Sequence, residues 1–527
     1  CTSKLCQGYT TAVHVYLNSN CCKQVDGDIK MLAIWLAVIA VVLFVLFSYI
    51  TGLKNLIPGP SGWPVVGCLF QLEPSRLHFS FDRWAKKYGP LILCKMAATN
   101  VFVISCPRLI KKAFAEKGYS DILNDRPDTF FAKYIMDDSK GVVFGKYGQT
   151  FIRLRKIMYK GLNLYGEGVQ QFESMAHKEL ERLMKSFTDL EGRDFDIKEL
   201  LSRSLANLIG ILLTGSMVDE TDADLIWKYN NNVNDTVEMS TDVMLSAFPF
   251  LRFMPVEVGQ RYRRTMGAKK ELLDKYFFSH KETYVPGRER GLVDVLFKIQ
   301  SQEKSVADTQ WLTDSQIKAF IQDIIFAGLI TTRNGLLCIL LVLLHHHECV
   351  DRMYQEIVEA VGLERSPSLK DRPAMPYSEA VILEALRYVT HAPIAVPHGA
   401  REDVEFEGYT IPKGSRLIVN IWTVHHDPAI WGDPWIFRPE RFLDEYGKLL
   451  PAEHTLRQSL VTFGSGKRVC VGENLAKSRI FLYLTTLIQK FDLLLPKVGT
   501  VPSDDSRTFL PGAALRPQDY KMRLKVR

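Results

Sequence analysis

The longest helical pattern in the chain is the feature that most restricts its fold. It begins at "LTDSQ", where Thr313 and Gln316 have the spacing of a capping box, and it continues to about His347. Such a helix is about 50 Å long, enough to cross a whole domain. A membrane span is the alternative, but Asp323 and the polar residues 331–334 interrupt the apolar sequence. Because the pattern is apolar on nearly all sides, we expect a buried central helix.

The rest of the chain predicts a mainly α fold with small β-sheets. Helical patterns dominate residues 76–390, whereas strand signals are short and come late, as in residues 404–422 with a turn at Pro412 and Gly414. The 527 residues, 47% of them hydrophobic, can bury a large core. Since no linker composition interrupts the sequence after residue 75, we expect one domain over residues 76–527.

The N-terminal region predicts attachment to a membrane. Residues 32–50 are nineteen residues without a charge, long enough to cross a hydrocarbon core. We expect a transmembrane anchor over residues 31–51, with Lys54 favouring a cytosolic location for the remainder of the chain. Prolines then make residues 52–75 a stiff elbow. Residues 1–30 precede Met31 and resemble neither a targeting peptide nor a domain, so we interpret them as an artefact of sequence assembly or a disordered tail.

Charge and cysteine spacing exclude several classes of function. The formal net charge of +7 suits a solvated surface or a docking face for an acidic partner or membrane. The sequence has no cluster of Lys and Arg with interleaved aromatic residues, which argues against nucleic-acid binding. Ten cysteines are present without a CxxC pair, which argues against a zinc ribbon and a thioredoxin-like redox pair.

The segment "FGSGKRVCVG", residues 463–472, sets one cysteine, Cys470, among glycines and basic residues. One thiolate cannot build a zinc site, but it can be the axial ligand of a haem iron. Glycines at 464, 466 and 472 allow the backbone to approach a flat macrocycle. Arg468 offers positive charge to carboxylates, and a helix from Glu473 would help to hold the sulfur as an anion. A buried, inert cysteine in a glycine turn remains the alternative.

This segment resembles the cysteine signature FxxGxRxCxG of the cytochrome P450 family of haem-thiolate monooxygenases. Four other segments match family motifs in the family's order: "FIRLRK" with Arg155, "AGLITT" at 327–332, "EALR" with Glu384 and Arg387, and "FRPERF" with Arg441. The resemblance covers about residues 31–527 and implies the cytochrome P450 fold behind a membrane anchor. Around residues 387–400 the chain resembles microsomal xenobiotic, fatty-acid and steroid hydroxylases, those of the 17-alpha type among them.

The resemblance implies a role for each matching residue. Cys470 would be the axial ligand of haem b, in a loop whose Phe463, Gly464 and Gly466 lie against the macrocycle. The haem propionates would meet a set of cationic or hydrogen-bonding groups: Arg126, Arg155, His398 and Arg468. Thr331, with Thr332 beside it, would guide protons to bound dioxygen. Glu384, Arg387 and Arg441 would form a structural network.

Three positions depart from the family pattern. Ile330 replaces the acidic residue that usually precedes the threonine, which predicts slow or uncoupled oxygen activation. Phe151 replaces the usual tryptophan, and His426 replaces a common arginine. Neither of these two is expected to threaten the fold.

The resemblance predicts a monooxygenase of the endoplasmic reticulum membrane with a cytosolic catalytic domain. It would insert one atom of O2 into a lipophilic steroid, fatty acid or xenobiotic. Electrons would come from NADPH through a separate NADPH–cytochrome P450 reductase, with cytochrome b5 as a second candidate partner. We expect an apolar pocket lined by residues 130–136, 326–331, 392–396 and 510–511. Residues 244–255 are expected either to dip into the membrane or to pack in the core. Two alternatives are a haem-thiolate isomerase or dehydratase acting on a peroxide, and a non-catalytic haem-binding membrane protein.

Overall fold

The computed structural model describes most of the chain after the predicted anchor. It covers residues 57–527 apart from 64, 98, 164–169, 237–243, 247 and 305–310, together with positions 31, 35, 36, 38–40 and 43. The predicted N-terminal tail, residues 1–30, lies outside the described residues. So do most of the predicted anchor, residues 31–51, and the start of the elbow.

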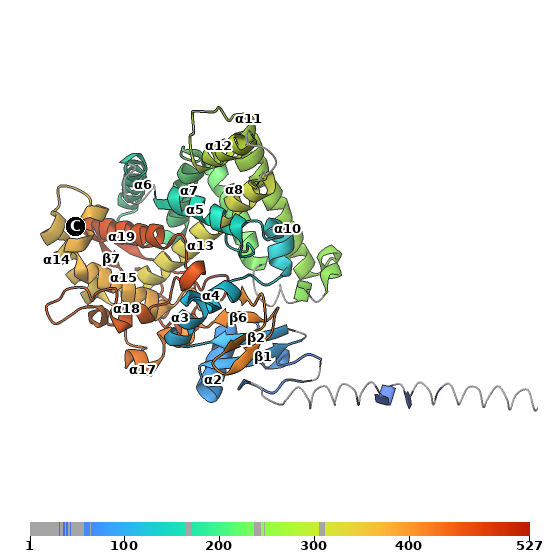
Figure 1. The fold of residues 1–527 in the computed structure, drawn as a ribbon. Coiled ribbons are helices and arrows are strands. Elements are labelled where there is room, and N and C mark those ends of the chain that lie inside the picture. The colour runs from blue at the N-terminus through green and yellow to red at the C-terminus, as the bar shows by residue number, and fades with distance from the viewer. Residues whose placement is uncertain are drawn as a thin grey trace, which may run out of the picture.

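The described chain is mainly helical with small sheets, as the sequence predicted (Figure 1). The α-helices of the part before the central helix are α2 (Leu77–Tyr88), α3 (Pro107–Ala115), α4 (Tyr119–Ile122), α5 (Gln149–Asn163), α6 (Gln170–Thr188), α7 (Ile197–Thr214), α8 (Glu220–Thr236), α10 (Glu257–Leu273), α11 (His280–Glu282) and α12 (Leu292–Lys304). The later ones are α13 (Asp314–His345), α14 (His347–Val361), α15 (Pro376–Val389), α16 (Ile421–His425), α17 (Pro428–Trp431), α18 (Thr455–Ser459) and α19 (Glu473–Lys490). Short 3-10 and π turns connect several of them, among them η4 (Pro249–Phe253), η7 (Pro439–Phe442) and η8 (Gly466–Arg468).

The central helix α13 is the predicted long helix. The Thr313 hydroxyl accepts a hydrogen bond from the Gln316 N–H at 3.4 Å, and Gln316 Oε1 accepts one from the Thr313 N–H at 2.6 Å, which completes the capping box. Among the described helices α13 is long and apolar enough to cross a membrane, but 83% of its most apolar window is buried in the protein. It packs against α7, α8, α15 and α19 and is therefore the core helix of the domain.

Strands from both halves of the chain form the largest sheet, whose order is β1 (Leu91–Met96), β2 (Thr99–Ile104), β6 (Arg416–Val419) and β3 (His398–Gly399). β1 and β2 are antiparallel, and β2 pairs with β6 in parallel, with Val101 opposite Arg416. Two-stranded sheets are formed by β4 (Val404–Phe406) with β5 (Tyr409–Ile411) and by β7 (Phe491–Leu494) with β8 (Arg523–Val526). The β2–β6 pairing holds the N-terminal part of the described chain beside the segments that come after α15 (Figure 1).

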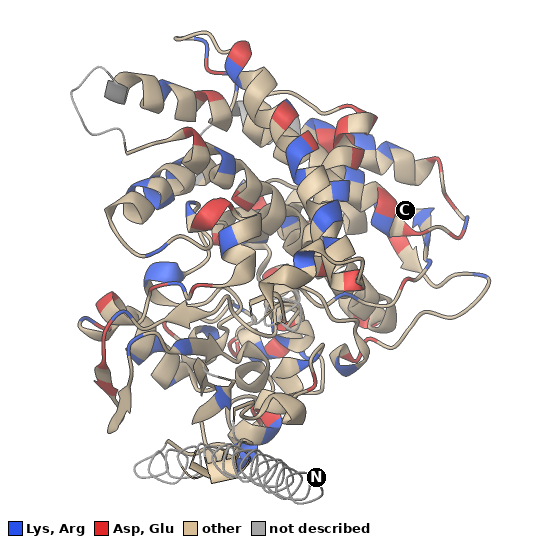
Figure 2. Cartoon of the chain, turned by 90° about the vertical axis from the view of Figure 1, so that its right-hand side faces the viewer, with Lys and Arg blue, Asp and Glu red and all other residues tan. Residues whose placement is uncertain are grey.

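Basic and acidic residues are interspersed over most of the helices in the view of Figure 2. This distribution agrees with the modest net charge of +7 and with a largely solvated surface.

Candidate active site

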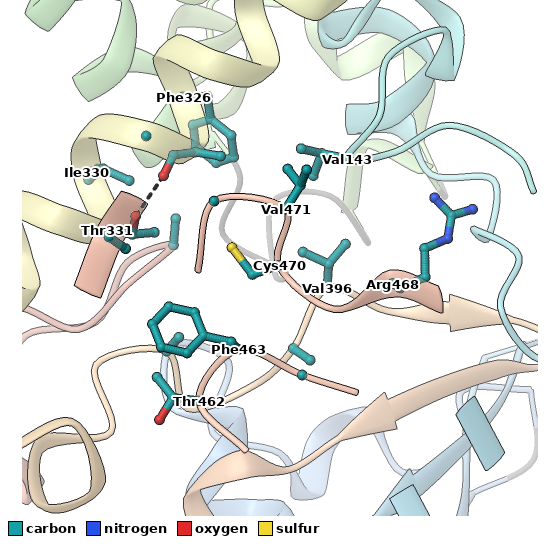
Figure 3. A pocket seen from close by; sticks show the side chains of 18 of the residues that line it. Val143, Phe326, Ile330, Thr331, Val396, Thr462, Phe463, Arg468, Cys470 and Val471 are labelled. Carbon is teal, nitrogen blue, oxygen red and sulfur yellow. Dashed lines mark hydrogen bonds between the residues drawn. The ribbon is translucent and has the colours of Figure 1, made fainter. Parts of the chain in front are cut away.

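A cavity of about 470 Å³ lies between α13 and the loop that carries Cys470 (Figure 3). Its walls come from α13, from the segment after α15, from the loop 462–472 and from the start of α19. Most of the side chains that line it are apolar, including Phe326, Ile330 and Val396. A lipophilic ligand that enters the cavity would therefore exchange its contact with water for apolar contact with the wall.

The loop before Cys470 is fixed by backbone contacts. The Cys470 N–H donates to the Phe463 carbonyl at 2.8 Å. Gly466 has a φ of 68°, and a Cβ at this position would lie 1.8 Å from the Phe114 carbonyl oxygen, so only glycine fits here. The loop thus turns tightly against α3 and presents the Cys470 thiol to the cavity.

The Cys470 side chain is exposed toward the cavity, and most residues of its loop are half-buried. Burial raises the pKa of the Cys470 thiol, and the Gly472 N–H opposes this effect, as do the charges of Arg155 and Lys477. The predicted help from the start of α19 is therefore present at Gly472, but it does not outweigh desolvation. A metal ion would be needed to hold this sulfur as a thiolate near neutral pH.

Three buried or half-buried arginines gather beside the Cys470 loop. Their guanidinium hydrogen bonds end on main-chain carbonyls: Arg126 donates to Val143, Val396 and Pro397, Arg468 to Asn124, Val142 and Gly145, and Arg155 to Val469. Burial and the charge of Arg468 hold the pKa of Arg126 well below its usual value. Such a cluster favours an anionic ligand with several oxygens, because buried guanidinium groups form their strongest hydrogen bonds with carboxylates.

His398 adds a neutral polar group to this cluster. Burial, together with the charges of Arg126 and Arg468, holds its pKa well below the usual value. Its Nδ1 is buried and has no hydrogen-bond partner among the described residues. A ligand carboxylate near the arginines would supply the missing partner.

These observations fit a haem group. One unpaired thiol faces an apolar cavity, and cationic groups with capacity for two propionates lie to one side of it, as Arg468 does in Figure 3. The structure therefore brings together Cys470, Arg126, Arg155, His398 and Arg468, as the sequence predicted. Phe463, Gly464 and Gly466 also lie in this loop, and the first two line the cavity.

Thr331 and Thr332 line the cavity from α13. The Thr331 hydroxyl donates to the Ala327 carbonyl at 2.6 Å (Figure 3), and the Thr332 hydroxyl donates to the Gly328 carbonyl at 3.2 Å. Ile330 is 1% exposed and lines the same wall, so an apolar side chain occupies the place of the usual acid.

Glu384 and Arg387 are fully buried on α15 and form a two-point ion pair, at 2.8 Å through Arg387 Nε and at 2.7 Å through Nη2. Arg441 approaches Glu384 Oε1 with its Nε at 3.3 Å. Arg387 Nη1 also donates to the carbonyls of His425 and Pro434, at 2.9 and 2.8 Å. The three side chains therefore join α15 to η7 and to the segment between α16 and η7.

The lining differs from the prediction at two places. Within residues 326–331 only Leu329 is turned away, and residues 392–396 all line the cavity. Residues 130–136 do not line it: Phe131 lies behind Phe326, with their ring centroids 6.1 Å apart. Residues 510–511 are also not in the wall, because the turn places Gly512 and Ala513 there instead. Both errors arise because the distance of a segment from the cavity cannot be read from its own sequence.

Several polar residues in the lining were missed by the sequence analysis, among them Asp323, His391 and Arg479. Asp323 Oδ2 accepts hydrogen bonds from the N–H groups of Val142 and Val143 at 2.5 and 3.0 Å. Its spacing of eight residues from Thr331 was the available signal, because it places both on one face of the helix. Arg479 was detectable as a charge in a helix that is otherwise apolar on its next turns.

The cytochrome P450 family model matches residues 57–524 of the chain. Three relatives named steroid 17-alpha-hydroxylase/17,20 lyase are similar over nearly their whole length. The one from Ictalurus punctatus is 32% identical and covers 89% of this chain and 91% of its own. Those from Squalus acanthias and Gallus gallus are 31% and 30% identical, and each covers 88% of this chain and 91% of its own. With haem as its cofactor, the chain belongs to the cytochrome P450 family of monooxygenases.

Proposed function

We propose that this enzyme hydroxylates a steroid or a closely related lipophilic compound. The proposal is carried by one observation: the cavity that receives the Cys470 thiol is walled mainly by apolar side chains and is also lined by Thr331. The names of its relatives support a steroid as the class of substrate.

Each residue of the cavity has a role in this proposal. Cys470 holds the haem iron, and haem supplies the activation of O2 from which one oxygen atom enters the substrate. The propionates are held by Arg126, Arg155, His398 and Arg468, and the loop with Phe463, Gly464 and Gly466 lies against the macrocycle. Thr331 holds a proton at the cavity wall, and Thr332 orders the neighbouring carbonyl of Gly328.

Glu384, Arg387 and Arg441 act at a distance from the substrate. Their buried ion pairs fix the segment 425–441, and His425 in turn accepts a hydrogen bond from the Val461 N–H at 3.0 Å through its Nε2. Val461 stands just before the Cys470 loop. We infer that the network keeps this loop in position.

NADPH–cytochrome P450 reductase is the proposed electron donor, with cytochrome b5 as a further partner. Helix α5 exposes Arg153, Lys156 and Lys160, and its Arg155 contacts the Cys470 loop through the Val469 carbonyl. A basic helix surface beside that loop favours docking of an acidic partner protein.

Membrane attachment rests on the apolar run at residues 32–50 and on a second apolar surface. The 3-10 turn η4 and its surroundings expose Phe248, Phe250, Phe253 and Met254, with Phe253 72% exposed. Large exposed aromatic side chains in one short segment are typical of a membrane-contacting surface. We propose a single-pass anchor in the endoplasmic reticulum membrane, with this segment inserted at the bilayer surface and the catalytic domain in the cytosol.

Spectroscopy of the purified protein tests the proposal. Reduction under carbon monoxide should give the red-displaced Soret band of thiolate ligation, and Cys470→Ala should abolish it. Steroids, fatty acids and aromatic compounds can then be ranked by the change in spin state that displacement of water from the ferric iron produces. If no steroid changes the spectrum, the proposed substrate class is wrong.

Ile330 favours a second candidate function, that of an isomerase or dehydratase that acts on a lipid peroxide. Such a reaction needs no proton relay to O2, so an apolar residue at this position would not harm it. The position of Thr331 in the cavity wall favours the monooxygenase. Turnover of a lipid hydroperoxide without NADPH would support the second candidate.

A further inference from the structure

Arg479, in the second turn of α19, is a buried cation that forms no ion pair with the described residues. The residue is only 4% exposed, and its Nε and Nη2 have no hydrogen-bond partner among the described residues. Its Nη1 makes one long hydrogen bond, at 3.4 Å, to the Gly328 carbonyl. Burial lowers the pKa of Arg479 to about 10, so the guanidinium remains charged at neutral pH.

The guanidinium of Arg479 lies beside the threonine pair of α13. The Gly328 carbonyl that it approaches also accepts the hydrogen bond of the Thr332 hydroxyl, at 3.2 Å. Arg479, Gly328 and Thr332 all line the cavity, together with the apolar Ile209 and Leu212 of α7. A polar ligand at this end of the cavity would therefore meet two unused N–H donors within an apolar surround.

Glu179, an acidic group that interacts with the neighbouring Tyr483, is already engaged elsewhere. Tyr483, one turn along α19, shares a hydrogen bond of 2.7 Å with the Ser204 hydroxyl. Beyond it, Glu179 pairs with Arg182 at 3.1 Å and accepts a hydrogen bond from Asn207 at 3.1 Å. Glu179 is thus committed to these partners, and the charge of Arg479 is left uncompensated at a cost that an unpaired buried ion normally avoids.

This cation is separate from the arginine cluster proposed to hold the propionates. Arg126 and Arg468 contact residues 124, 142–145 and 396–397, whereas Arg479 contacts α13. Figure 3 shows Arg468 and Thr331 on opposite sides of Cys470. Haem propionates held by the cluster would leave Arg479 without a partner.

We propose that Arg479 binds a carboxylate at the α13–α19 side of the cavity. The carboxylate comes either from one end of a lipophilic acid that is the substrate or from a small acid in solution, such as formate. A planar guanidinium with two free N–H groups suits a carboxylate better than a spherical anion. Ile330 gives the site a consequence, because the bound acid would stand near Thr332 and Thr331, next to the position where Ile330 replaces the usual acidic residue.

The inference deepens the proposed function and rests on it only for the identity of the substrate. Ferric holoenzyme of the full chain is compared as wild type, Arg479→Gln and Arg479→Lys. Dissociation constants for a long-chain fatty acid and its methyl ester are taken from the spin-state change of the haem. Thermal unfolding is measured in sodium formate and in sodium chloride at equal ionic strength, which needs no substrate.

If the substrate supplies the carboxylate, wild type binds the acid about tenfold or more tightly than the ester, as expected for charged hydrogen bonds. Arg479→Gln removes this preference and Arg479→Lys keeps part of it. If solvent supplies it, formate raises the unfolding temperature of wild type above its value in chloride, and Arg479→Gln does not respond.

Equal binding of acid and ester together with equal unfolding temperatures in formate and chloride would overturn the inference, and so would a preference that survives in Arg479→Gln. A neutral steroid distinguishes the two proposals. If the steroid changes the spectrum of every variant, while acid and ester bind equally and formate has no effect beyond that of chloride, the proposed function stands and the carboxylate site does not exist. If formate raises the unfolding temperature but neither the steroid nor the acid changes the spectrum, the carboxylate site is supported and the proposed class of substrate is wrong.

Discussion

Arg387 and Glu384 face each other one helical turn apart on α15, joined by two hydrogen bonds, and both side chains have no exposed surface. An ion pair in such a position contributes little by its presence, because the attraction mostly offsets the desolvation of the two charges. Removing one partner is a different matter, since the other charge then remains buried and uncompensated.

Glu384→Ala is therefore expected to destabilise the protein by about 3–5 kcal/mol, because it leaves both Arg387 and Arg441 buried without their carboxylate. Denaturant unfolding of the holoenzyme measures the loss. Glu199→Ala is the matched control, because Glu199 pairs with Arg203 on the exposed surface of α7 at 3.0 Å and its loss should change stability little. Equal effects of the two substitutions would contradict the proposed importance of the buried network.

Gly466→Ala should prevent the Cys470 loop from closing. The added Cβ would lie 1.8 Å from the Phe114 carbonyl oxygen, and relief would require movement of α3 or of the turn η8. We expect poor haem retention, measured as the ratio of Soret to protein absorbance. Gly447→Ala is the control: it has a similar φ of 76° but no atom within 4 Å, so it tests backbone strain alone, which costs about 1–2 kcal/mol.

Ile330→Glu should raise the amount of product formed for each NADPH consumed. The substitution restores an acidic group next to Thr331, where general acid catalysis is otherwise lacking. Product, peroxide and NADPH are measured together in the presence of a reductase. Ile330→Gln has nearly the same shape without the acid and should not improve the ratio. Tight coupling in the wild type would show that the apolar residue does no harm.

Stability should fall as the pH drops from about 6.5 to about 4, with His391 as one cause. Burial lowers the pKa of His391 to about 4, whereas an unfolded histidine takes up its proton near 6.5. Between these values the unfolded state binds the extra proton, so acid favours unfolding. His391→Leu should reduce the slope of unfolding free energy against pH by about 1.4 kcal/mol per pH unit.

A tryptophan in place of Phe250 should be quenched by brominated lipids when the full chain is reconstituted in bilayers. Phe250 is 57% exposed and lies beside other exposed aromatic residues in η4. Tyr446→Trp provides the control, because Tyr446 is 79% exposed but has no such neighbours in its turn. Similar quenching at the two positions would argue that η4 has no special relation to the membrane.

Features with a local cause were predictable from the sequence. The capping box at Thr313 and Gln316 and the apolar pattern after it placed the start of α13 within a residue and its end within two. The ion pair of Glu384 with Arg387 is expected from their spacing on a helix. The mainly helical fold with small sheets was predicted by pattern and by the resemblance together.

Features that depend on how distant segments meet were not predictable in this way. Residues 130–136 looked like a pocket wall because they are mostly apolar, yet Phe131 packs on Phe326, and only Phe326 lines the cavity. Arg479 could be noticed as a charge in an apolar helix, but only the folded structure shows that polar atoms of His391 and Arg479 are left without partners among the described residues. Hydrogen-bond satisfaction is a property of the folded chain and cannot be read from one segment.

The hydrogen bond from Arg468 Nε to the Asn124 carbonyl, at 2.8 Å, joins positions that are 344 residues apart. The cradle for the cofactor therefore cannot be assembled by either half of the polypeptide. During synthesis the carbonyls of the early segment therefore stay hydrated until nearly the entire protein has left the ribosome. Premature termination anywhere before residue 468 should yield a product unable to retain haem, however much of its helical core has formed.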